Sequence, residues 1–278
     1  MYPELLKFLG IHFVRSYGVL LAIAFLLGII WARRRAIKAG IPGQHVIDLS
    51  FIVLIASIVG SRFFYVIYHL DEFSDNILNI INPFHGDTIG IYGLSMMGGV
   101  VLALISASLF FYFKRINPWP LLDAMMPMFA LGLGIARIGC FLNGCCFGLP
   151  HEGFLGIIFP PDSGAGFQFP DTALIPTQLY SSLAGFAILG IVLISERYMK
   201  FEGHSFWLTI ILYSIWRFII DFYRYYEDSM IFTVIGSTRF TRNQLLTALL
   251  FVISIVAYFV MYRRSRIKVQ DDPGRSAS

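Results

Sequence analysis

Long apolar stretches separated by short polar segments run through the whole chain. Each stretch approaches or exceeds the length that a membrane-spanning helix needs, which is about 20 predominantly apolar residues. We therefore expect an all-α, polytopic membrane protein that forms one domain over residues 1–268, followed by a disordered polar tail over 269–278. The apolar stretches predict about seven transmembrane helices, over residues 16–32, 49–68, 89–113, 121–141, 179–195, 206–223 and 245–262.

Basic residues gather in alternate segments between these stretches, which predicts the orientation of the chain. Cytoplasmic segments are enriched in lysine and arginine. We therefore expect the amino terminus outside and the carboxyl terminus in the cytoplasm. The basic residues that follow the first, third, fifth and seventh stretches are Arg33, Arg34, Arg35, Lys38, Lys114, Arg115, Arg197, Lys200, Arg263, Arg264, Arg266 and Lys268.

Composition supports the membrane assignment and excludes several other classes. Of the 278 residues 57% are apolar and 14% are charged, with a mean hydropathy of +0.71. Soluble domains are about 45–50% apolar and about 25% charged, so a water-soluble globule is excluded. The net charge of +4 comes from residues beside apolar stretches, and we expect no nucleic-acid partner. Three cysteines cannot all pair, so a disulfide scaffold is not expected.

Two segments outside the stretches carry expectations of their own. Residues 2–13 place apolar side chains at helical spacing, which fits an interfacial helix, although a frayed terminus explains the segment equally well. Residues 142–177 form a long segment rich in glycine and proline. Long irregular loops are commonly functional. We interpret this segment as an external element that faces the substrate.

Three arginines occupy similar depths in the second, fourth and sixth stretches: Arg62, Arg137 and Arg217. A charge at the centre of the bilayer costs about 2.5–3.5 kcal/mol, so such residues face protein or water. Local pairing is one explanation, since Asp221 lies four residues after Arg217. A cavity for an anionic ligand such as a phospholipid phosphate explains all three together, because guanidinium groups bind phosphate through paired donors.

Glycines mark the same region of the chain. Gly98 and Gly99 interrupt the third stretch, and others thread through residues 132–148. Small residues at such spacing indicate close helix packing more often than a site. The segment 136–148, with the sequence ARIGCFLNGCCFG, adds Arg137 and three thiols to the glycines, as a packed turn beside a cavity would.

This segment resembles the signature of the prolipoprotein diacylglyceryl transferase family, G-R-x-G-N-F-x-N-G-E-x-x-G. Further likenesses run along the chain in the family's order. The matching residues are Tyr17-Gly18, Gly60-Ser61-Arg62 with Tyr65, Ser95 with Gly98-Gly99, Arg137, Gly139, Phe141, Asn143, Gly144, Gly148, Pro176, Gln178-Leu179-Tyr180, Tyr213, Arg217, Phe218, Phe222, Arg224 and Asp228.

The resemblance implies transfer of the diacylglyceryl group of phosphatidylglycerol to the lipobox cysteine of a secreted preprolipoprotein. A thioether forms and glycerol phosphate leaves, at the outer face of a bacterial inner membrane. It implies catalytic roles for Arg137, Arg217, Tyr213 and Tyr17. The implied contacts with phosphatidylglycerol are made by Arg137, Arg217, Arg62, Asn143, Gly98, Gly99, Gln178 and Arg224.

The departures from the family pattern that bear most directly on the chemistry are Met97, Cys140 and Cys145. Met97 stands where the family has a histidine that is a candidate base for the incoming thiol. A thiol has a pKa of about 8.5 and reacts as the thiolate. One explanation is that the positive charge of the arginines activates the substrate thiol, with Tyr17 or Tyr213 positioning it. Another is that a different residue of this chain is the base. A third is that this chain is a divergent relative with changed chemistry.

The cysteine cluster of Cys140, Cys145 and Cys146 has three explanations from sequence. Buried thiols can act as small apolar side chains. Two of them can form a disulfide on the outer side of a bacterial membrane. Metal binding is the weakest of the three, since closely spaced thiols with no nearby histidine pair make a poor zinc pattern. We expect neither a metal nor a cofactor.

Two other functions compete with transfer. A divergent, non-catalytic or altered-specificity paralogue would bind anionic lipid or a lipoprotein without making the thioether, and Met97 and Cys145 prompt this alternative. A transporter or receptor with seven spans would need a polar path across the membrane. The inner halves of the stretches offer few ionisable residues beyond Asp48 and Asp123, which disfavours that class.

Overall fold

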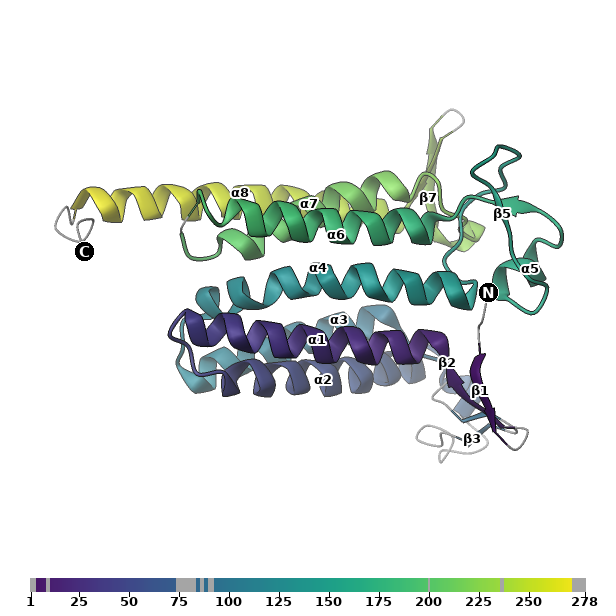
Figure 1. Cartoon of the computed structure of the whole chain (residues 1–278), viewed down its shortest axis with the longest axis horizontal. Helices are drawn as coiled ribbons and strands as arrows, with labels where there is room; N and C mark the ends of the chain where they lie inside the picture. The colour runs from purple at the N-terminus through teal and green to yellow at the C-terminus, as the bar shows by residue number, and fades with distance from the viewer. Residues whose placement is uncertain are drawn as a thin grey trace.

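The computed structural model describes residues 4–8, 11–73, 84–85, 88–89, 93–199, 201–235 and 238–271. Within these residues, seven long helices lie side by side along one axis (Figure 1). They confirm an all-α membrane protein. The long helices are α1 (Ser16–Lys38), α2 (Gln44–Tyr68), α3 (Met96–Lys114), α4 (Pro118–Asn143), α6 (Thr177–Ser195), α7 (His204–Ile220) and α8 (Arg242–Asp271).

Six of these helices are long and apolar enough to cross a membrane, and α7 is the exception. Its 17 residues extend about 26 Å at 1.5 Å per residue, less than the hydrocarbon core of about 30 Å. The sixth of the seven predicted helices is thus present as a shorter apolar helix. It still packs within the bundle, against α4, α6 and α8.

Short strands gather at one end of the bundle, where they pair as antiparallel hairpins (Figure 1). The carboxyl ends of α1, α3, α6 and α8 lie at the opposite end, where Lys38 ends α1, Lys114 ends α3 and Arg197 follows α6. This separation agrees with the predicted division into outer and cytoplasmic sides. The strands are β1 (Glu4–Phe8), β2 (Ile11–Arg15), β3 (Phe84–His85), β4 (Thr88–Ile89), β5 (Ile157–Ile158), β6 (Ala173–Leu174), β7 (Ile231–Ile235) and β8 (Thr238–Thr241).

Two expectations for the chain ends meet different outcomes. Strands β1 and β2 pair with each other, so the interfacial helix expected over residues 2–13 is wrong. Over so few residues, the spacing of apolar side chains fits the period of a strand as well as that of a helix. The hairpin satisfies the backbone N–H and C=O groups by pairing the two strands. Helix α8 runs to Asp271, beyond the expected start of the tail at 269, and residues 272–278 lie outside the described residues.

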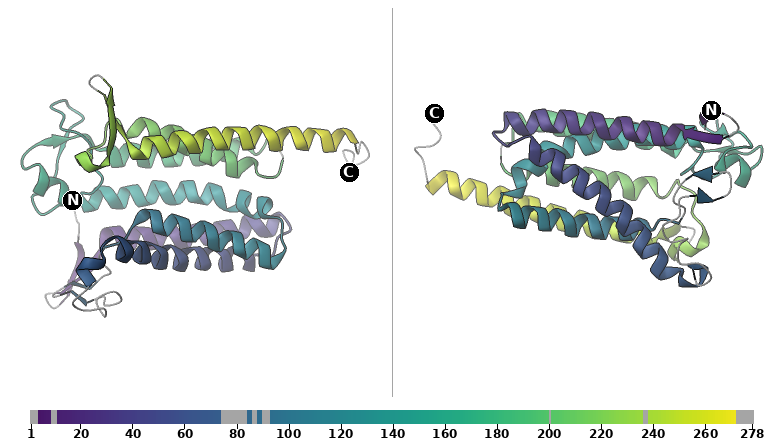
Figure 2. Two further views of the ribbon diagram at one scale, coloured as in Figure 1. Left: turned by 180° about the vertical axis from the view of Figure 1, so that it is seen from behind. Right: turned by 90° about the horizontal axis from the view of Figure 1, so that it is seen from below.

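Helix α4 lies in the middle of the bundle, with α6, α7 and α8 on one side and α1, α2 and α3 on the other (Figure 1). It contacts α1, α6 and α7 extensively and α2 only slightly, whereas α3 packs mainly on α2. Helices α1 and α2 diverge toward the end that carries the strands (Figure 2). The outer end of the α2–α3 pair is therefore set apart from α4.

The predicted external loop is a folded element. It contains the β5–β6 hairpin and the short helix α5 (Gly164–Gln168), whose amino terminus is capped by the Ser163 hydroxyl. A buried apolar cluster of Phe147, Phe159, Ala165 and Leu174 holds these pieces together. The segment between α4 and α6 is thus a small packed layer over the end of the bundle that carries the strands.

Candidate active site

The end of α4 forms a tight turn that presents three thiols. Gly144 caps the helix at a φ of 66°, in the left-handed region that glycine adopts without strain. Cys146 also lies in this region, at a φ of 61°, which is uncommon for a residue with a Cβ. Cys140 in the last turn of α4 and Cys145 and Cys146 in the turn bring their sulfur atoms within 4.8 Å of one another.

The thiols differ in their electrostatic surroundings. Hydrogen bonds from Cys140 and then Cys145 lower the pKa of the Cys146 thiol below its ordinary value, and the charges of Arg224 and Arg137 act in the same direction. The pKa of Cys145 is raised: the hydrogen bond with Cys140 lowers it, but that with Cys146, together with burial, outweighs this effect. The surroundings therefore stabilise the thiolate form of Cys146 more than that of Cys145.

Arg137 is a member of the same cluster. It lies on α4, within hydrogen-bonding reach of the Cys146 thiol, and it interacts electrostatically with Tyr213 of α7 and Tyr17 of α1. An ideal Cβ at Gly139 would lie 3.3 Å from the Cα of Tyr17, so α1 closely approaches the end of α4 that leads into the cysteine turn. Asn143 hydrogen-bonds to Cys145. The predicted residues Arg137, Tyr17, Tyr213 and Asn143 are thus brought together.

The start of α6 fixes the backbone of the turn. The buried Gln178 side chain donates from Nε2 to the carbonyl oxygen of Cys145 at 2.8 Å, and the Thr177 hydroxyl donates to that of Cys146 at 2.9 Å. Gln178 was expected at the lipid, and the structure gives it a positioning contact. Thr177 was not predicted as a functional residue, although it stands beside Gln178 in the matched motif.

Arg224 reaches the thiols from the segment after α7. Gly148 pairs with Arg224 in an isolated antiparallel bridge, where an added Cβ at Gly148 would lie 2.7 Å from the carbonyl oxygens of Ile175 and Tyr223. Among the described residues, the buried Nε of Arg224 has no hydrogen-bond partner. The guanidinium lies 5.1 Å from the ring centroid of Tyr226.

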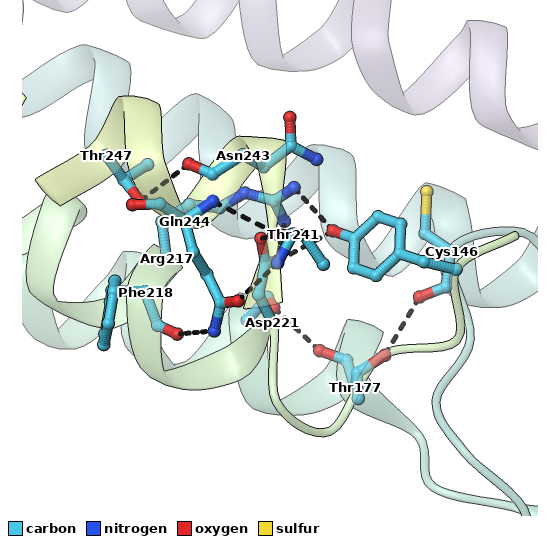
Figure 3. Close-up of polar contacts among 11 residues, drawn as sticks. Cys146, Thr177, Arg217, Phe218, Asp221, Thr241, Asn243, Gln244 and Thr247 are labelled. Atoms are coloured by element: carbon cyan, nitrogen blue, oxygen red, sulfur yellow. Dashed lines mark hydrogen bonds and ion pairs between the residues drawn. The ribbon is translucent and has the colours of Figure 1, made fainter. Parts of the chain in front are cut away.

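Arg217 belongs to a polar network next to this cluster (Figure 3). Its guanidinium pairs with the buried Asp221 at 3.1 Å and donates to the Tyr226 hydroxyl at 2.8 Å. That hydroxyl donates to Asp221 at 2.7 Å. Burial raises the pKa of Tyr226, which keeps the hydroxyl protonated as a donor. The side chain of Arg217 extends toward the turn that carries Cys146 (Figure 3). The pairing that the spacing of Arg217 and Asp221 offered is present.

Thr241 and Gln244 anchor this network to the start of α8 (Figure 3). Gln244 Oε1 accepts from the Thr241 backbone N–H, and Thr241 Oγ1 accepts from that of Gln244, which is a capping box. The Thr241 hydroxyl also donates to Asp221 at 3.3 Å. Sequence reasoning missed both residues and Tyr226, although the T-x-x-Q pattern was a readable signal for the cap.

Arg62 lies in a different environment from the other predicted arginines. It donates to the carbonyl oxygen of Gly93 at 3.2 Å, and its guanidinium lies 5.1 Å from the ring centroid of Phe73 and 5.8 Å from that of Tyr65. These contacts all belong to α2 and the segments beside it. The similar depth predicted for the three arginines therefore does not place them in one group.

Gly98, Gly99 and Met97 also belong to the α2–α3 pair. A Cβ at Gly98 would clash with Gly60 and Phe64 of α2, and one at Gly99 would clash with Ser61. The close packing of helices that small residues indicated is therefore the structural role of both glycines. Met97 is 48% exposed. An apolar cavity of about 340 Å³ opens between the helices, lined by Ser57, Ser61, Met96, Gly99, Val100, Ala103 and Leu104.

Comparison with known proteins assigns the chain to a family. Residues 3–260 match the family described as prolipoprotein diacylglyceryl transferase. A phosphatidylglycerol–prolipoprotein diacylglyceryl transferase of Clostridium tetani is 31% identical over 229 residues, covering 81% of this chain and 86% of the relative. A protein of the same name from Staphylococcus aureus is 31% identical over 261 residues, covering 92% of this chain and 87% of the relative. The chain belongs to the prolipoprotein diacylglyceryl transferase family.

Proposed function

We propose that this chain transfers the diacylglyceryl group of phosphatidylglycerol to the lipobox cysteine thiol of a secreted preprolipoprotein. The reaction takes place at the outer face of a bacterial inner membrane and releases glycerol phosphate. The observation that carries this proposal is the gathering of Arg137, Arg224 and Arg217 around one turn at the strand-bearing end. The names of the relatives point to the same two substrates.

Arg137 and Arg224 are the residues that bind the lipid phosphate. A guanidinium group presents donors in a planar fork that matches phosphate. Both guanidinium groups interact electrostatically with the Cys146 thiol, so their positive fields overlap at this position. When the bond between glycerol carbon and phosphate oxygen breaks, negative charge grows on the leaving phosphate. Cations fixed in advance stabilise that charge most effectively.

Arg217 contributes its charge and holds Tyr226 in place. Asp221 and the Tyr226 hydroxyl engage one N–H on each of its two terminal nitrogens, and a guanidinium carries five N–H donors. The remaining donors suit a further contact with the phosphate. Tyr226 in turn stacks against Arg224, so the pair aligns the second phosphate ligand. Tyr213 and Tyr17, beside Arg137, orient the incoming thiol.

The other predicted residues have supporting roles. Gln178 and Asn143 position the turn through Cys145. Gly98 and Gly99 let α3 approach α2, and the apolar cavity beside Gly99 suits an acyl chain of the lipid. Arg62 supports the outer end of α2 rather than binding the phosphate. The residue that replaces the histidine, Met97, cannot accept a proton, so activation of the thiol has another source.

Complementation tests the proposal. The chain is expressed in a bacterial strain depleted of its own diacylglyceryl transferase, and one lipoprotein is analysed by mass spectrometry. We expect a thioether-linked diacylglyceryl group on its lipobox cysteine. The matched control is Arg239→Ala, because Arg239 lies at the same end of the bundle with its side chain 64% exposed. Normal expression without modification would favour the lipid-binding paralogue instead.

A further inference from the structure

The three sulfur atoms at the end of α4 have the separation of metal ligands. They lie within 4.8 Å of one another and come from Cys140, Cys145 and Cys146. In a tetrahedral zinc site with Zn–S bonds of about 2.3 Å, two sulfur atoms are about 3.8 Å apart. A small rotation of the cysteine side chains would therefore bring the three sulfur atoms to the separation found around a zinc ion. Sequence spacing alone did not show this, because Cys145 and Cys146 are adjacent.

The backbone is built to make neighbouring thiols converge. Successive side chains in an extended segment point to opposite sides. Here the left-handed conformation of Cys146 turns its side chain to the same side as Cys145. Backbone strain of this kind persists where the surrounding structure holds it. Gln178 and Thr177 do so, through the two carbonyl oxygens of the cysteine pair.

The charges around the thiols suit a tris-thiolate zinc site. Three thiolates and Zn²⁺ together carry one negative charge. Arg137 is within hydrogen-bonding reach of Cys146, and Arg224 interacts with it electrostatically. These two cations balance the site and can donate to its sulfur atoms. A disulfide would use two of the three thiols, would be neutral, and would leave the arginines facing no anion.

We infer that Cys140, Cys145 and Cys146 bind a zinc ion whose fourth position takes the thiol of the incoming protein substrate. The inference rests on the proposed function and supplies the activation that Met97 cannot. Among the described residues, the cluster offers three ligands and no fourth histidine, cysteine or carboxylate. Zinc sites with three protein ligands are those that leave a position for water or substrate. Cys145 and Cys146 are half-buried, so the site can be reached.

The reaction balances without a histidine base. The substrate thiol binds zinc as a thiolate and releases its proton to water. The thiolate sulfur attacks the carbon of the diacylated glycerol that is esterified to the phosphate, and the C–S bond forms. The C–O bond to phosphate breaks, and its electron pair leaves with glycerol phosphate, which Arg137 holds. The product thioether is a neutral, weaker ligand and leaves the zinc. No electrons are gained or lost by the metal or the protein.

Metal analysis of the full-length chain, purified in detergent, tests the site. We expect about one zinc ion per chain. Removing zinc with a chelator should abolish transfer, and adding zinc alone should restore it, with no substitution involved. Cys145→Ala should lower the zinc content at least tenfold. Cys145→Asp is the matched variant, since aspartate is a zinc ligand and should retain the ion.

Cobalt substitution tests the fourth position separately from activity. Co²⁺ in the site should show a sulfur-to-cobalt charge-transfer band. A lipobox peptide should strengthen this band, and the same peptide with serine for cysteine should not. A metal-free chain that makes the thioether, with free thiols or a disulfide, would overturn the inference and leave the proposed function standing. Bound metal whose spectrum the peptide does not change would overturn the role of the fourth position. A peptide response without thioether formation would support the site and contradict the proposed function.

Discussion

Arg62 on α2 and Arg137 on α4 have similar predicted depths in the membrane, yet their surroundings differ. Arg62 is held by a backbone carbonyl and two aromatic rings on the α2 side of the bundle. Arg137 faces thiols, tyrosines and a second arginine in the centre, beside the layer formed by the segment between α4 and α6. Local contacts can satisfy a guanidinium at either position. Depth in the membrane thus identifies arginines that need a partner, and their neighbours decide which one meets a ligand.

The two regions also differ in how they are built. The α2–α3 pair is held by glycines and apolar packing, as Gly60 and Gly98 show. The region around α4, α6 and α7 contains buried polar side chains with defined partners, such as Gln178 and Asp221. Hydrogen bonds of this kind hold atoms in fixed positions. We therefore expect substitutions in the second region to change the chemistry and those in the first to change stability.

Arg137→Ala gives the largest expected effect. Removing a cation that stabilises the leaving phosphate should lower the rate of transfer about 100- to 1,000-fold. The rate is measured with phosphatidylglycerol and a lipobox peptide, and Arg239→Ala should keep the normal rate. A rate for Arg137→Ala within threefold of the unmodified chain would remove Arg137 from the active site.

Gly98→Ala should destabilise the α2–α3 pair, because its Cβ meets the backbone of Gly60 and the side chain of Phe64. Overpacking of this kind costs about 1–3 kcal/mol of unfolding free energy. Thermal unfolding in detergent measures the effect. Gly132→Ala is the matched control, since an added Cβ there meets nothing within 4 Å. Equal unfolding temperatures for the two variants would refute the role of Gly98 in packing.

Tyr226→Phe should lower the rate of transfer by at least about tenfold, because hydrogen bonds to charged groups contribute about 1.5–3 kcal/mol and about 1.4 kcal/mol is tenfold in rate. The change removes the hydroxyl that joins Arg217 to Asp221 and leaves the ring against Arg224. Tyr223→Phe is the control, at a position 52% exposed. If both variants work at the normal rate, Arg217 does not depend on Tyr226.

Arg62→Ala should have the smallest effect on transfer, less than about threefold, because the residue acts through packing. Loss of its contacts with Tyr65 and Phe73 should lower the unfolding free energy by about 0.5–1 kcal/mol. Parallel measurements of transfer rate and thermal unfolding separate the two effects. A rate as low as that of Arg137→Ala would mean that both arginines serve one site.

Local sequence patterns predicted the helices and some of the contacts. Apolar stretches gave the bundle, because membrane-spanning helices are set by length and hydropathy. Spacing of four residues gave the ion pair of Arg217 and Asp221, since such residues share a helix face. The cap of α8 by Thr241 and Gln244 was readable from the same kind of local rule.

Contacts between distant segments could not be read in this way. The convergence of Cys145 and Cys146 depends on hydrogen bonds from α6, more than 30 residues later. The separation of Arg62 from Arg137 depends on the divergence of α1 and α2 (Figure 2). Strands β1 and β2 are too short for their apolar period to be distinguished from a helical one. In each case tertiary packing decides, and a single sequence does not record it.

Reconstituted transfer tests the central claim most directly. The purified chain, in vesicles that contain phosphatidylglycerol, is mixed with a peptide bearing a lipobox cysteine. Mass spectrometry follows the peptide, and released glycerol phosphate is measured in the same sample. The account predicts a thioether-linked diacylglyceryl peptide and glycerol phosphate in equal amounts, both lost in Arg137→Ala. An unmodified peptide with phosphatidylglycerol still bound to the protein would contradict it.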